Sequence, residues 1–136
     1  MPHLIIEHSN NIGDATASQF LVDRVHRAAQ ESPIVPAAGL RTRATARSAY
    51  RVADGREDNA FVAVVARLGP GRTAAEKSTF ISLVLDVVEA AVVELAPDLV
   101  VSYSVEYQEI DAEFRRNRNH IRTRMEQEAS DRPDAG

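Results

Sequence analysis

Two strand–helix–strand patterns of similar length follow one another along the chain, and this repetition limits the folds that are possible. The predicted segments are residues 3–8, 14–31 and 40–47 in the first half and 60–66, 73–96 and 99–108 in the second. Apolar side chains recur at a helical spacing in the long segments, and the short ones are apolar or alternate with period two. A helix that crosses between two strands makes them parallel, with a right-handed connection. Each half therefore predicts a parallel pair of strands with a helix packed on it.

Residues that favour turns and helix ends separate these segments. Pro33 and Pro36 follow the first helix, and Asp54-Gly55 is a tight-turn signal between the halves. Residues 73–76, Thr-Ala-Ala-Glu, have the pattern of a capping box at the start of the longest helix. The strand at 60–66 is apolar at every position, which predicts a strand covered on both faces.

The two halves together predict an α/β (α+β) fold with a four-stranded mixed sheet and both helices on one face. Period two places Arg41 and Arg43 on one face of their strand and Thr42 and Ala44 on the other. The second face of the sheet then has no helix to cover it. A small sheet with a bare, partly apolar face favours association with other copies.

Length and composition narrow the class of protein. The 136 residues fit one domain, which we predict at residues 1–122, followed by a polar tail over 123–136 that is partly disordered. The chain has no cysteine, which excludes a disulfide framework and a thiolate metal site. No apolar run is long enough to span a bilayer, and the first residues lack the pattern of a signal peptide. We therefore expect a cytoplasmic protein with no membrane partner.

An arginine-rich stretch near the C-terminus is the feature that suggests nucleic acid. Its arginines are Arg115, Arg116, Arg118, Arg122 and Arg124. The stretch has little aromatic surface on which bases can stack, and the formal net charge of the chain is −4. We expect no nucleic-acid partner, and instead a solvated or intersubunit segment with Glu113, Glu126 and Glu128 as acidic partners.

The first predicted strand follows directly on Met1-Pro2. A small second residue such as proline permits removal of the initiator methionine, which leaves the secondary amine of Pro2 at the N-terminus. A free α-amine has a pKa of about 7.7–8.0, and a dry or cationic pocket lowers it further. Such an amine can act as a general base near neutral pH. Many proteins begin with Met-Pro and make no use of it, so this role needs support from the rest of the chain.

Several motifs occur in an order and at a spacing that resemble one enzyme family. They are Met1-Pro2-His3-Leu4-Ile5-Ile6-Glu7, Ala38-Gly39-Leu40-Arg41-Thr42-Arg43, Ala53-Asp54-Gly55, Ala60-Phe61-Val62, Gly69-Pro70-Gly71-Arg72 and Phe114-Arg115-Arg116-Asn117, with His120 after them. The set covers roughly residues 2–121 and resembles 5-carboxymethyl-2-hydroxymuconate Δ-isomerase of the tautomerase superfamily. The resemblance implies a homotrimer of βαβ repeats, a free N-terminal proline as base, and no metal or organic cofactor. It also implies an enol-to-ketone isomerisation of a carboxylated enol in homoprotocatechuate (4-hydroxyphenylacetate) breakdown.

Two segments differ from the family pattern. Where the family tends toward Asn-Asn-Val/Ile-His, this chain has Asn117-Arg118-Asn119-His120. Residues 44–49 are small, apart from Arg47, where relatives often carry aromatic side chains and a histidine. Because residues 44–49 lie close to the expected pocket, this difference bears on the substrate more than on the type of reaction.

Four side chains are candidates for holding the substrate. Arginine binds carboxylates with a planar fork and stays charged. Arg41 is the first candidate, since it starts a strand parallel to the first and so lies near Pro2. Arg72 is the second, because it precedes a capped helix whose N-terminus favours an anion. Arg43 shares the face of Arg41, and Tyr50 can supply a hydroxyl or an apolar wall. For each, a solvated or packed surface position is the alternative.

Two further interpretations stay open. One is a tautomerase of another enol acid, such as a phenylpyruvate- or oxalocrotonate-like compound, and the small residues at 44–49 motivate it. The other is a trimeric protein of this fold that has lost activity and serves as a binding or scaffold partner through its basic tail.

Overall fold

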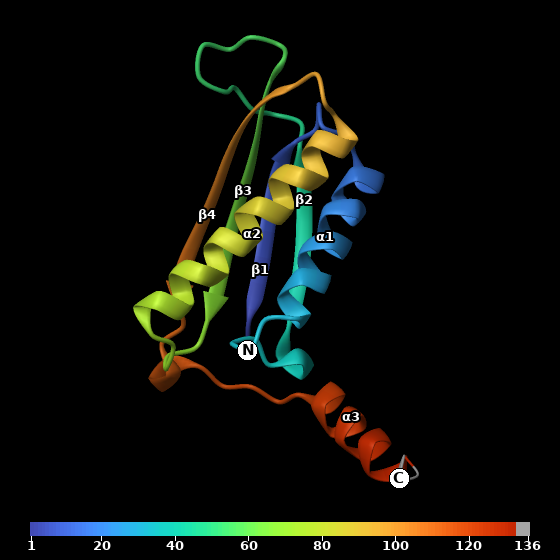
Figure 1. Cartoon of the computed structure of the whole chain (residues 1–136), viewed down its shortest axis with the longest axis vertical. Helices are drawn as coiled ribbons and strands as arrows, with labels where there is room; N and C mark the ends of the chain where they lie inside the picture. Colours follow the sequence, from blue (N-terminus) through green and yellow to red (C-terminus); the bar gives the residue numbers. More distant parts are fainter. Residues whose placement is uncertain (133–136) are drawn as a thin grey trace.

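The structure, a computed structural model, describes residues 1–132 and contains one four-stranded sheet with two long helices on one face (Figure 1). The strands are β1 (His3–Ser9), β2 (Arg41–Arg47), β3 (Asn59–Leu68) and β4 (Val100–Glu109), and the long helices are α1 (Ala15–Gln30) and α2 (Ala74–Leu95). The strand order is β2-β1-β3-β4. β1 and β2 are parallel, as are β3 and β4, and β1 and β3 are antiparallel. The predicted mixed sheet and its two parallel pairs are confirmed.

The core fills the space between the sheet and the two helices. Successive residues of a strand point to opposite faces, and in β3 every second side chain, from Ala60 to Leu68, is buried. β1 contributes Leu4 and Ile6 in the same way. The helices add Leu21 and Val25 from α1 and Phe80, Val84, Val88 and Val92 from α2. Burial of these apolar side chains is the main interaction that holds the helices on the sheet.

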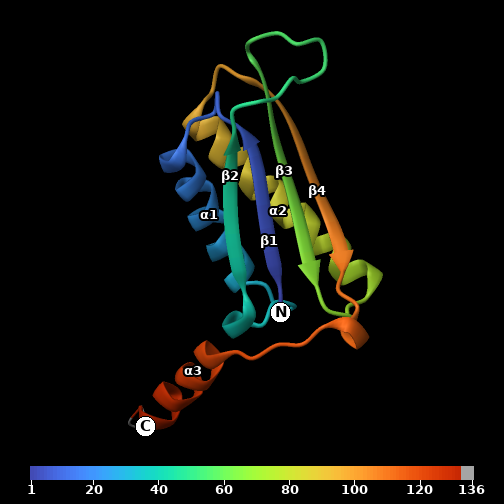
Figure 2. The same ribbon diagram turned by 180° about the vertical axis from the view of Figure 1, so that it is seen from behind.

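The opposite face of the sheet carries no helix (Figure 2). Along β3 its side chains, Phe61, Ala63 and Val65, are half-buried, and those of the edge strands β2 and β4 are exposed. The prediction that residues 60–66 are covered on both faces is therefore wrong for the single chain. Both helices pack on the same side, so only one face of β3 receives a covering layer. The half-buried side chains on this face of β3 are still a reason to expect that copies of the chain associate.

The two long helices start differently. The predicted capping box of α2 is confirmed: Thr73 Oγ1 accepts a hydrogen bond from the Glu76 N–H (3.1 Å), and Glu76 Oε1 accepts one from the Thr73 N–H (2.9 Å). Asp14 precedes α1, but its side chain makes no capping hydrogen bond. Side chains therefore satisfy free backbone N–H groups at the start of α2, whereas the side chain of Asp14 satisfies none at the start of α1.

The chain after β4 contains a helix where the sequence predicts none. The short turn η2 (Ala112–Phe114) leads into an extended stretch and then into α3 (His120–Asp131). This segment crosses below the start of β1 and reaches the short turn η1 (Ala37–Gly39) (Figure 1). Every residue of α3 is exposed, so no buried apolar stripe marks the helix in the sequence. The predicted domain boundary after residue 122 falls inside α3, and residues 133–136 of the predicted disordered tail lie outside the described residues.

Candidate active site

Pro2 is buried immediately before β1. Its carbonyl accepts a hydrogen bond from the Arg41 N–H (3.1 Å), where the parallel pairing of β1 and β2 begins. Proline has no N–H to donate, so it suits the start of a strand. Gly39 approaches so closely that an added Cβ would lie 3.2 Å from Pro2 Cδ. Pro2 is thus fixed at the junction of β1, η1 and β2.

The electrostatic surroundings of this junction favour a neutral amine. Burial, followed by the cations of Arg115, Arg72, Arg122 and Arg41, lowers the pKa of the Met1 α-amine below its ordinary value. The Met1 α-amine lies one residue ahead of the position that a free Pro2 amine would take. The same cations therefore surround the region where the predicted base would act.

Arg72 is partly buried and is tied to the backbone on two sides. Its Nε and Nη2 donate hydrogen bonds to the carbonyl of Ile34 (3.2 and 2.7 Å), and Nη1 donates to the carbonyl of Gly69 (2.9 Å). Three of its N–H groups are therefore used to join the turn before η1 to the loop before α2. Arg72 contributes its positive charge to the site, but much of its fork is already engaged.

Arg41 and Arg43 lie on the open face of β2. In the sheet register, His3 lies between Arg41 of β2 and Arg67 of β3. Burial, and then the cations of Arg43, Arg41, Arg67 and Arg115, lower the pKa of His3, which keeps its ring neutral near pH 7. Arg43 Nη1 therefore donates to His3 Nδ1 (3.2 Å). The Arg41 side chain is exposed and makes no hydrogen bond or ion pair with residues 1–132.

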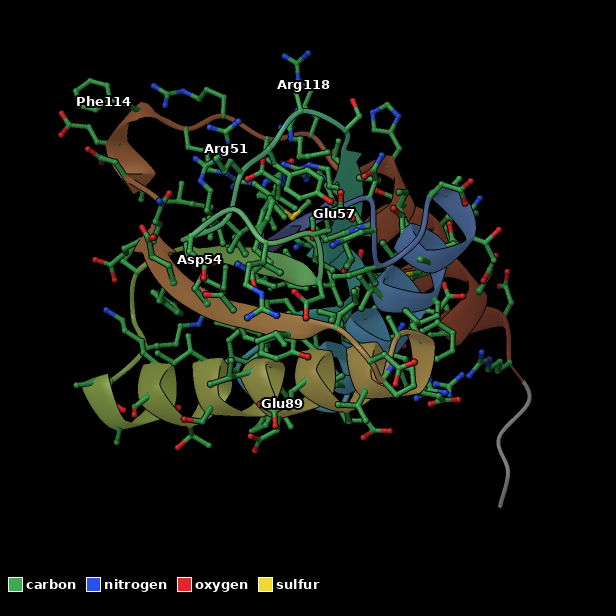
Figure 3. All side chains as sticks on the ribbon, turned by 90° about the horizontal axis from the view of Figure 1, so that it is seen from above. Arg51, Asp54, Glu57, Glu89, Phe114 and Arg118 are labelled. Carbon is green, nitrogen blue, oxygen red and sulfur yellow. The ribbon has the colours of Figure 1, made fainter. Side chains whose placement is uncertain are left out.

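Tyr50 lies at the opposite end of the sheet from Pro2. It follows β2, and β2 runs parallel to β1, so the length of a seven-residue strand, about 20 Å, separates the two residues. Its ring packs against Phe61 with the centroids 6.1 Å apart and the planes at 64°. The loop between β2 and β3, which carries Arg51, Asp54 and Glu57, covers this end (Figure 3). The structure does not bring Tyr50 to Pro2 within one chain.

The C-terminal segment brings three polar side chains to Met1 that were not among the sequence candidates. Arg115 and Asn119 are the only residues between 111 and 132 that are even partly buried. Asn119 Nδ2 donates to the carbonyl of Ala38 (2.8 Å) and lies 3.8 Å from Met1 Sδ. Arg122 Nη2 lies 3.7 Å from the same sulfur. The run of arginines is visible in the sequence, but only the path of the chain below β1 decides which of them approach Met1.

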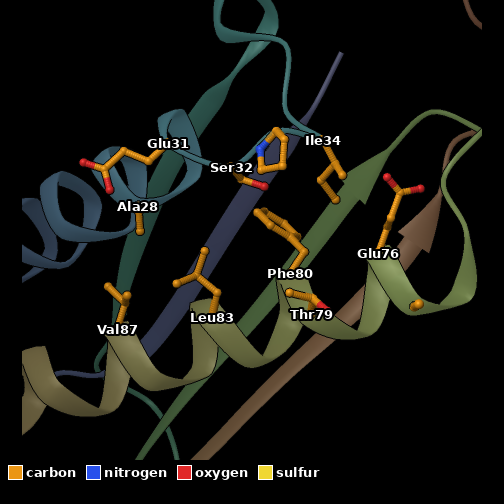
Figure 4. A pocket seen from close by; sticks show the side chains of 11 residues that line it. Ala28, Glu31, Ser32, Ile34, Glu76, Thr79, Phe80, Leu83 and Val87 are labelled. Atoms are coloured by element: carbon orange, nitrogen blue, oxygen red, sulfur yellow. The ribbon is translucent and has the colours of Figure 1, made fainter.

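An apolar cavity of about 600 Å³ lies between the end of α1, the turn that follows it and α2 (Figure 4). Phe80, Leu83 and Ile34 line it, together with the carboxylates of Glu31 and Glu76. Neither Pro2 nor any arginine is among its lining residues. Two carboxylates in apolar surroundings repel an anion, so this cavity does not suit the predicted carboxylated substrate.

Residues 1–132 provide neither a cluster of metal ligands nor a membrane-spanning helix. In this range no group of three or more histidine, aspartate or glutamate side chains is arranged to hold a metal ion. No helix in the described part of the chain combines the length and the apolar character that are needed to cross a membrane.

Comparison with known proteins confirms the resemblance that the motifs suggest. The family model for 5-carboxymethyl-2-hydroxymuconate isomerase matches residues 2–125. The 5-carboxymethyl-2-hydroxymuconate Delta-isomerase of Escherichia coli is 25% identical over 121 residues, which cover 89% of this chain and 96% of that protein. A crystal structure of a 5-carboxymethyl-2-hydroxymuconate isomerase from Deinococcus radiodurans R1 has a TM-score of 0.80 and 24% identity, and the match covers 91% of this chain and 93% of the other. A fused 4-OT symmetric trimer has a TM-score of 0.62 and 22% identity, with 79% and 85% covered. The fold is that of the tautomerases.

Proposed function

Because the chain belongs to the 5-carboxymethyl-2-hydroxymuconate isomerase family, we propose that it is an isomerase that converts a carboxylated dienol to its ketone, with the amine of Pro2 as general acid and base. The observation that carries the proposal is the meeting of Arg115, Arg72, Arg122 and Arg41 around the start of the chain, next to the buried Pro2. The proposed substrate is 5-carboxymethyl-2-hydroxymuconate, the proposed pathway is homoprotocatechuate breakdown, and the proposed location is the cytoplasm.

The reaction moves one proton and leaves the oxidation state unchanged. The Pro2 amine takes the proton from the 2-hydroxyl while the C–O bond becomes C=O and the conjugated double bonds shift. The resulting ammonium returns the proton to the far carbon of the system, so one base suffices and no cofactor is needed. A lowered pKa keeps enough of the amine neutral at pH 7 to begin the cycle. The mechanism requires a chain that starts at Pro2, since an amide nitrogen behind Met1 is not basic.

Three arginines serve the substrate in different ways under this proposal. The exposed fork of Arg41 is available for a bidentate contact with a carboxylate. Arg72, whose fork is largely bound to backbone carbonyls, acts through its charge. Arg43 holds His3 and adds positive charge to the same face. The positive field at this end of the sheet draws in a multiply charged anion.

We further propose that the active form is a homotrimer. The uncovered sheet face, with its half-buried apolar strip on β3, supports association between copies. One of the structures of similar fold is a trimer, which supports an assembly of three subunits. The position of Tyr50, one strand length from Pro2, means that it joins a site only from a neighbouring subunit.

The test combines N-terminal analysis with kinetics. Intact-mass measurement of protein made in cells should show that Met1 is absent. Pro2→Ala should then lower kcat/KM for ketonisation of 5-carboxymethyl-2-hydroxymuconate by about 100-fold, within the usual range for loss of general acid–base catalysis. Equal rates for the two proteins would rule out the proline mechanism.

A panel of enols separates the remaining interpretations. Faster turnover of a phenylpyruvate- or oxalocrotonate-like enol would favour a tautomerase of another acid. A wild-type protein that starts at Pro2 and turns over none of them would favour the inactive scaffold. Deletion of the chain after residue 110 adds a second readout: loss of partner binding supports the scaffold, and loss of the trimer supports a structural tail.

A further inference from the structure

The side chain of Met1 fills a slot directly beside Pro2. Gly39 forms one wall, and a Cβ added there would lie 2.5 Å from Met1 Sδ as well as 3.2 Å from Pro2 Cδ. A backbone that approaches both residues this closely has no room for a side chain while Met1 is present. Any molecule that occupies the place of the Met1 side chain is therefore in contact with the surroundings of Pro2.

Hydrogen-bond donors also line the slot. Asn119 Nδ2 lies 3.8 Å and Arg122 Nη2 lies 3.7 Å from Met1 Sδ. A thioether sulfur is a weak acceptor, and a guanidinium is matched much better by a carboxylate. Among residues 1–132, the Arg122 side chain has no ion pair and no contact with an oxygen acceptor within hydrogen-bond range. A methionine is thus held by groups that are suited to an anion.

The Asn119 side chain and the Arg122 backbone are fixed in position. Asn119 Nδ2 also donates to the carbonyl of Ala38 (2.8 Å), and Asn119 Oδ1 accepts a hydrogen bond from the Arg122 N–H (3.1 Å). The first bond attaches the start of α3 to η1, and the second caps α3 so that Arg122 lies one turn into the helix. Arg115, which is also partly buried, adds charge from the extended stretch before α3. The donors therefore belong to a built structure and do not lie on a free tail.

We propose that removal of Met1 turns this slot into a subsite for a second carboxylate of the substrate, bound by the guanidinium of Arg122 and the amide of Asn119. The inference rests on the proposed function and extends it from the reaction to the residues that would bind one of the substrate's carboxylates. Arg41 holds one carboxylate on the open side of β2, and the slot holds another near Gly39. The enzyme consequently prefers enols with two or more carboxylates over enols with one.

The test measures binding as well as turnover. The probes are adipate, with two carboxylates, and hexanoate, with one, titrated into the processed protein. Arg122→Gln should weaken adipate binding about 10-fold or more, the scale of one charge-assisted hydrogen bond, and should leave hexanoate binding within about twofold. The same variant should raise KM for 5-carboxymethyl-2-hydroxymuconate far more than KM for phenylenolpyruvate.

Two further variants control for charge and for folding. Arg118→Gln removes an equal charge from the same segment, but this side chain points away from the body of the protein (Figure 3), so adipate binding should be unchanged. Asn119→Asp keeps the oxygen that caps α3 and replaces the amide donor by a repelling carboxylate, so it should weaken adipate binding at least as much as Arg122→Gln does. A chain extended by Gly-Ser ahead of Met1 keeps the methionine in the slot and should also bind adipate more weakly.

The outcomes for the subsite and for the proposed function are separate. Equal loss of adipate and hexanoate binding in Arg122→Gln, or no loss of either, overturns the subsite even where Pro2→Ala abolishes turnover. A wild-type protein that turns over no enol overturns the proposed function. In that case, adipate binding that depends on Arg122, on Asn119 and on removal of Met1 still supports the subsite.

Discussion

The two ends of the sheet are built alike and differ in chemistry. β1 and β2 begin at one end, and β3 and β4 begin at the other, since β1 and β3 are antiparallel. At the first end the strands start beside the buried Pro2 and with Arg41. At the second they start with Asn59 and Val100. The strand–helix–strand unit occurs twice with the same backbone arrangement. The residues at the ends of the strands decide which of the two units can form an active site.

Charge shows the difference most clearly. Around the first end, the cations of Arg41, Arg72, Arg115 and Arg122 all act on one amine. At the second end, Asn59 Nδ2 donates to Asp54 Oδ1 (2.6 Å) and to the carbonyl of Val52 (3.1 Å), which closes the loop between β2 and β3. The polar groups there satisfy one another and stabilise a turn. Among residues 1–132, the arginines near Pro2 have no acidic partner within ion-pair distance, which is the condition for binding an anion.

The strongest test of this difference changes only the N-terminus. A Gly-Ser extension ahead of Met1 makes Pro2 an amide, removes the basic nitrogen and keeps Met1 in its slot. We expect kcat/KM to fall by about 100-fold or more, the scale of general acid–base catalysis, with the melting temperature nearly unchanged. Steady-state kinetics and thermal unfolding measure the two effects. Full activity in the extended chain would place the base elsewhere.

The next test compares the two ends of one strand. Arg41 and Arg47 lie on the same face of β2, but Arg47 is at the far end and pairs with Glu7 (2.6 Å). Arg41→Gln should raise KM about 10-fold or more through loss of a charge-assisted contact. Arg47→Gln should change KM less than about twofold, since Arg47 lies at the end of β2 away from Pro2. Similar KM values for the two variants would show that general charge, and not the position of Arg41, matters.

A third test asks whether the hydrogen bonds of Arg72 stabilise the fold. Arg72→Met removes three hydrogen bonds to the carbonyls of Ile34 and Gly69. We expect the free energy of unfolding to fall by about 2 kcal/mol, because the donor is charged and partly buried, whereas Arg41→Gln should leave it within about 0.5 kcal/mol. Urea unfolding at matched protein concentration measures both. A stable Arg72→Met variant would mean that water replaces these bonds.

The sequence predicts those features of the fold that depend on local residue patterns. The six segments, the capping box at Thr73 and the two parallel pairs follow from apolar spacing and from the residues that end helices. α3 does not, because all of its residues are exposed and it has no buried stripe. The approach of Arg115 and Asn119 to Met1 depends on the course of the stretch after η2, which no local preference sets. The bonds of Arg72 to Ile34 likewise exist only once the turn before η1 is in place.

A smaller effect distinguishes the two helices that cover the sheet. Thr73→Ala removes the side-chain cap of α2 and should lower the free energy of unfolding by about 1 kcal/mol. Asp14→Ala should cost less, since the Asp14 side chain makes no capping hydrogen bond with α1. Chemical denaturation of both variants checks the order. A greater loss for Asp14→Ala would mean that Asp14 stabilises the start of α1 through its charge alone.

The subtlest effect is on pH dependence. Cations beside an amine disfavour its protonated form, and Arg115 is the arginine that most lowers the pKa of the Met1 α-amine. We expect Arg115 to act in the same direction on the Pro2 amine. In the processed enzyme, Arg115→Gln should therefore move the acid limb of the kcat/KM profile to higher pH, and Arg51→Gln at the other end of the sheet should not move it. The pH dependence of stability follows from the same lowered pKa. Between the folded-state pKa and the higher unfolded-state pKa, the unfolded chain binds more protons than the folded one. Stability is therefore lost as pH falls from the unfolded-state pKa through the folded-state pKa. An unshifted limb in Arg115→Gln would show that burial alone sets the pKa and that the arginines at this end serve the substrate only.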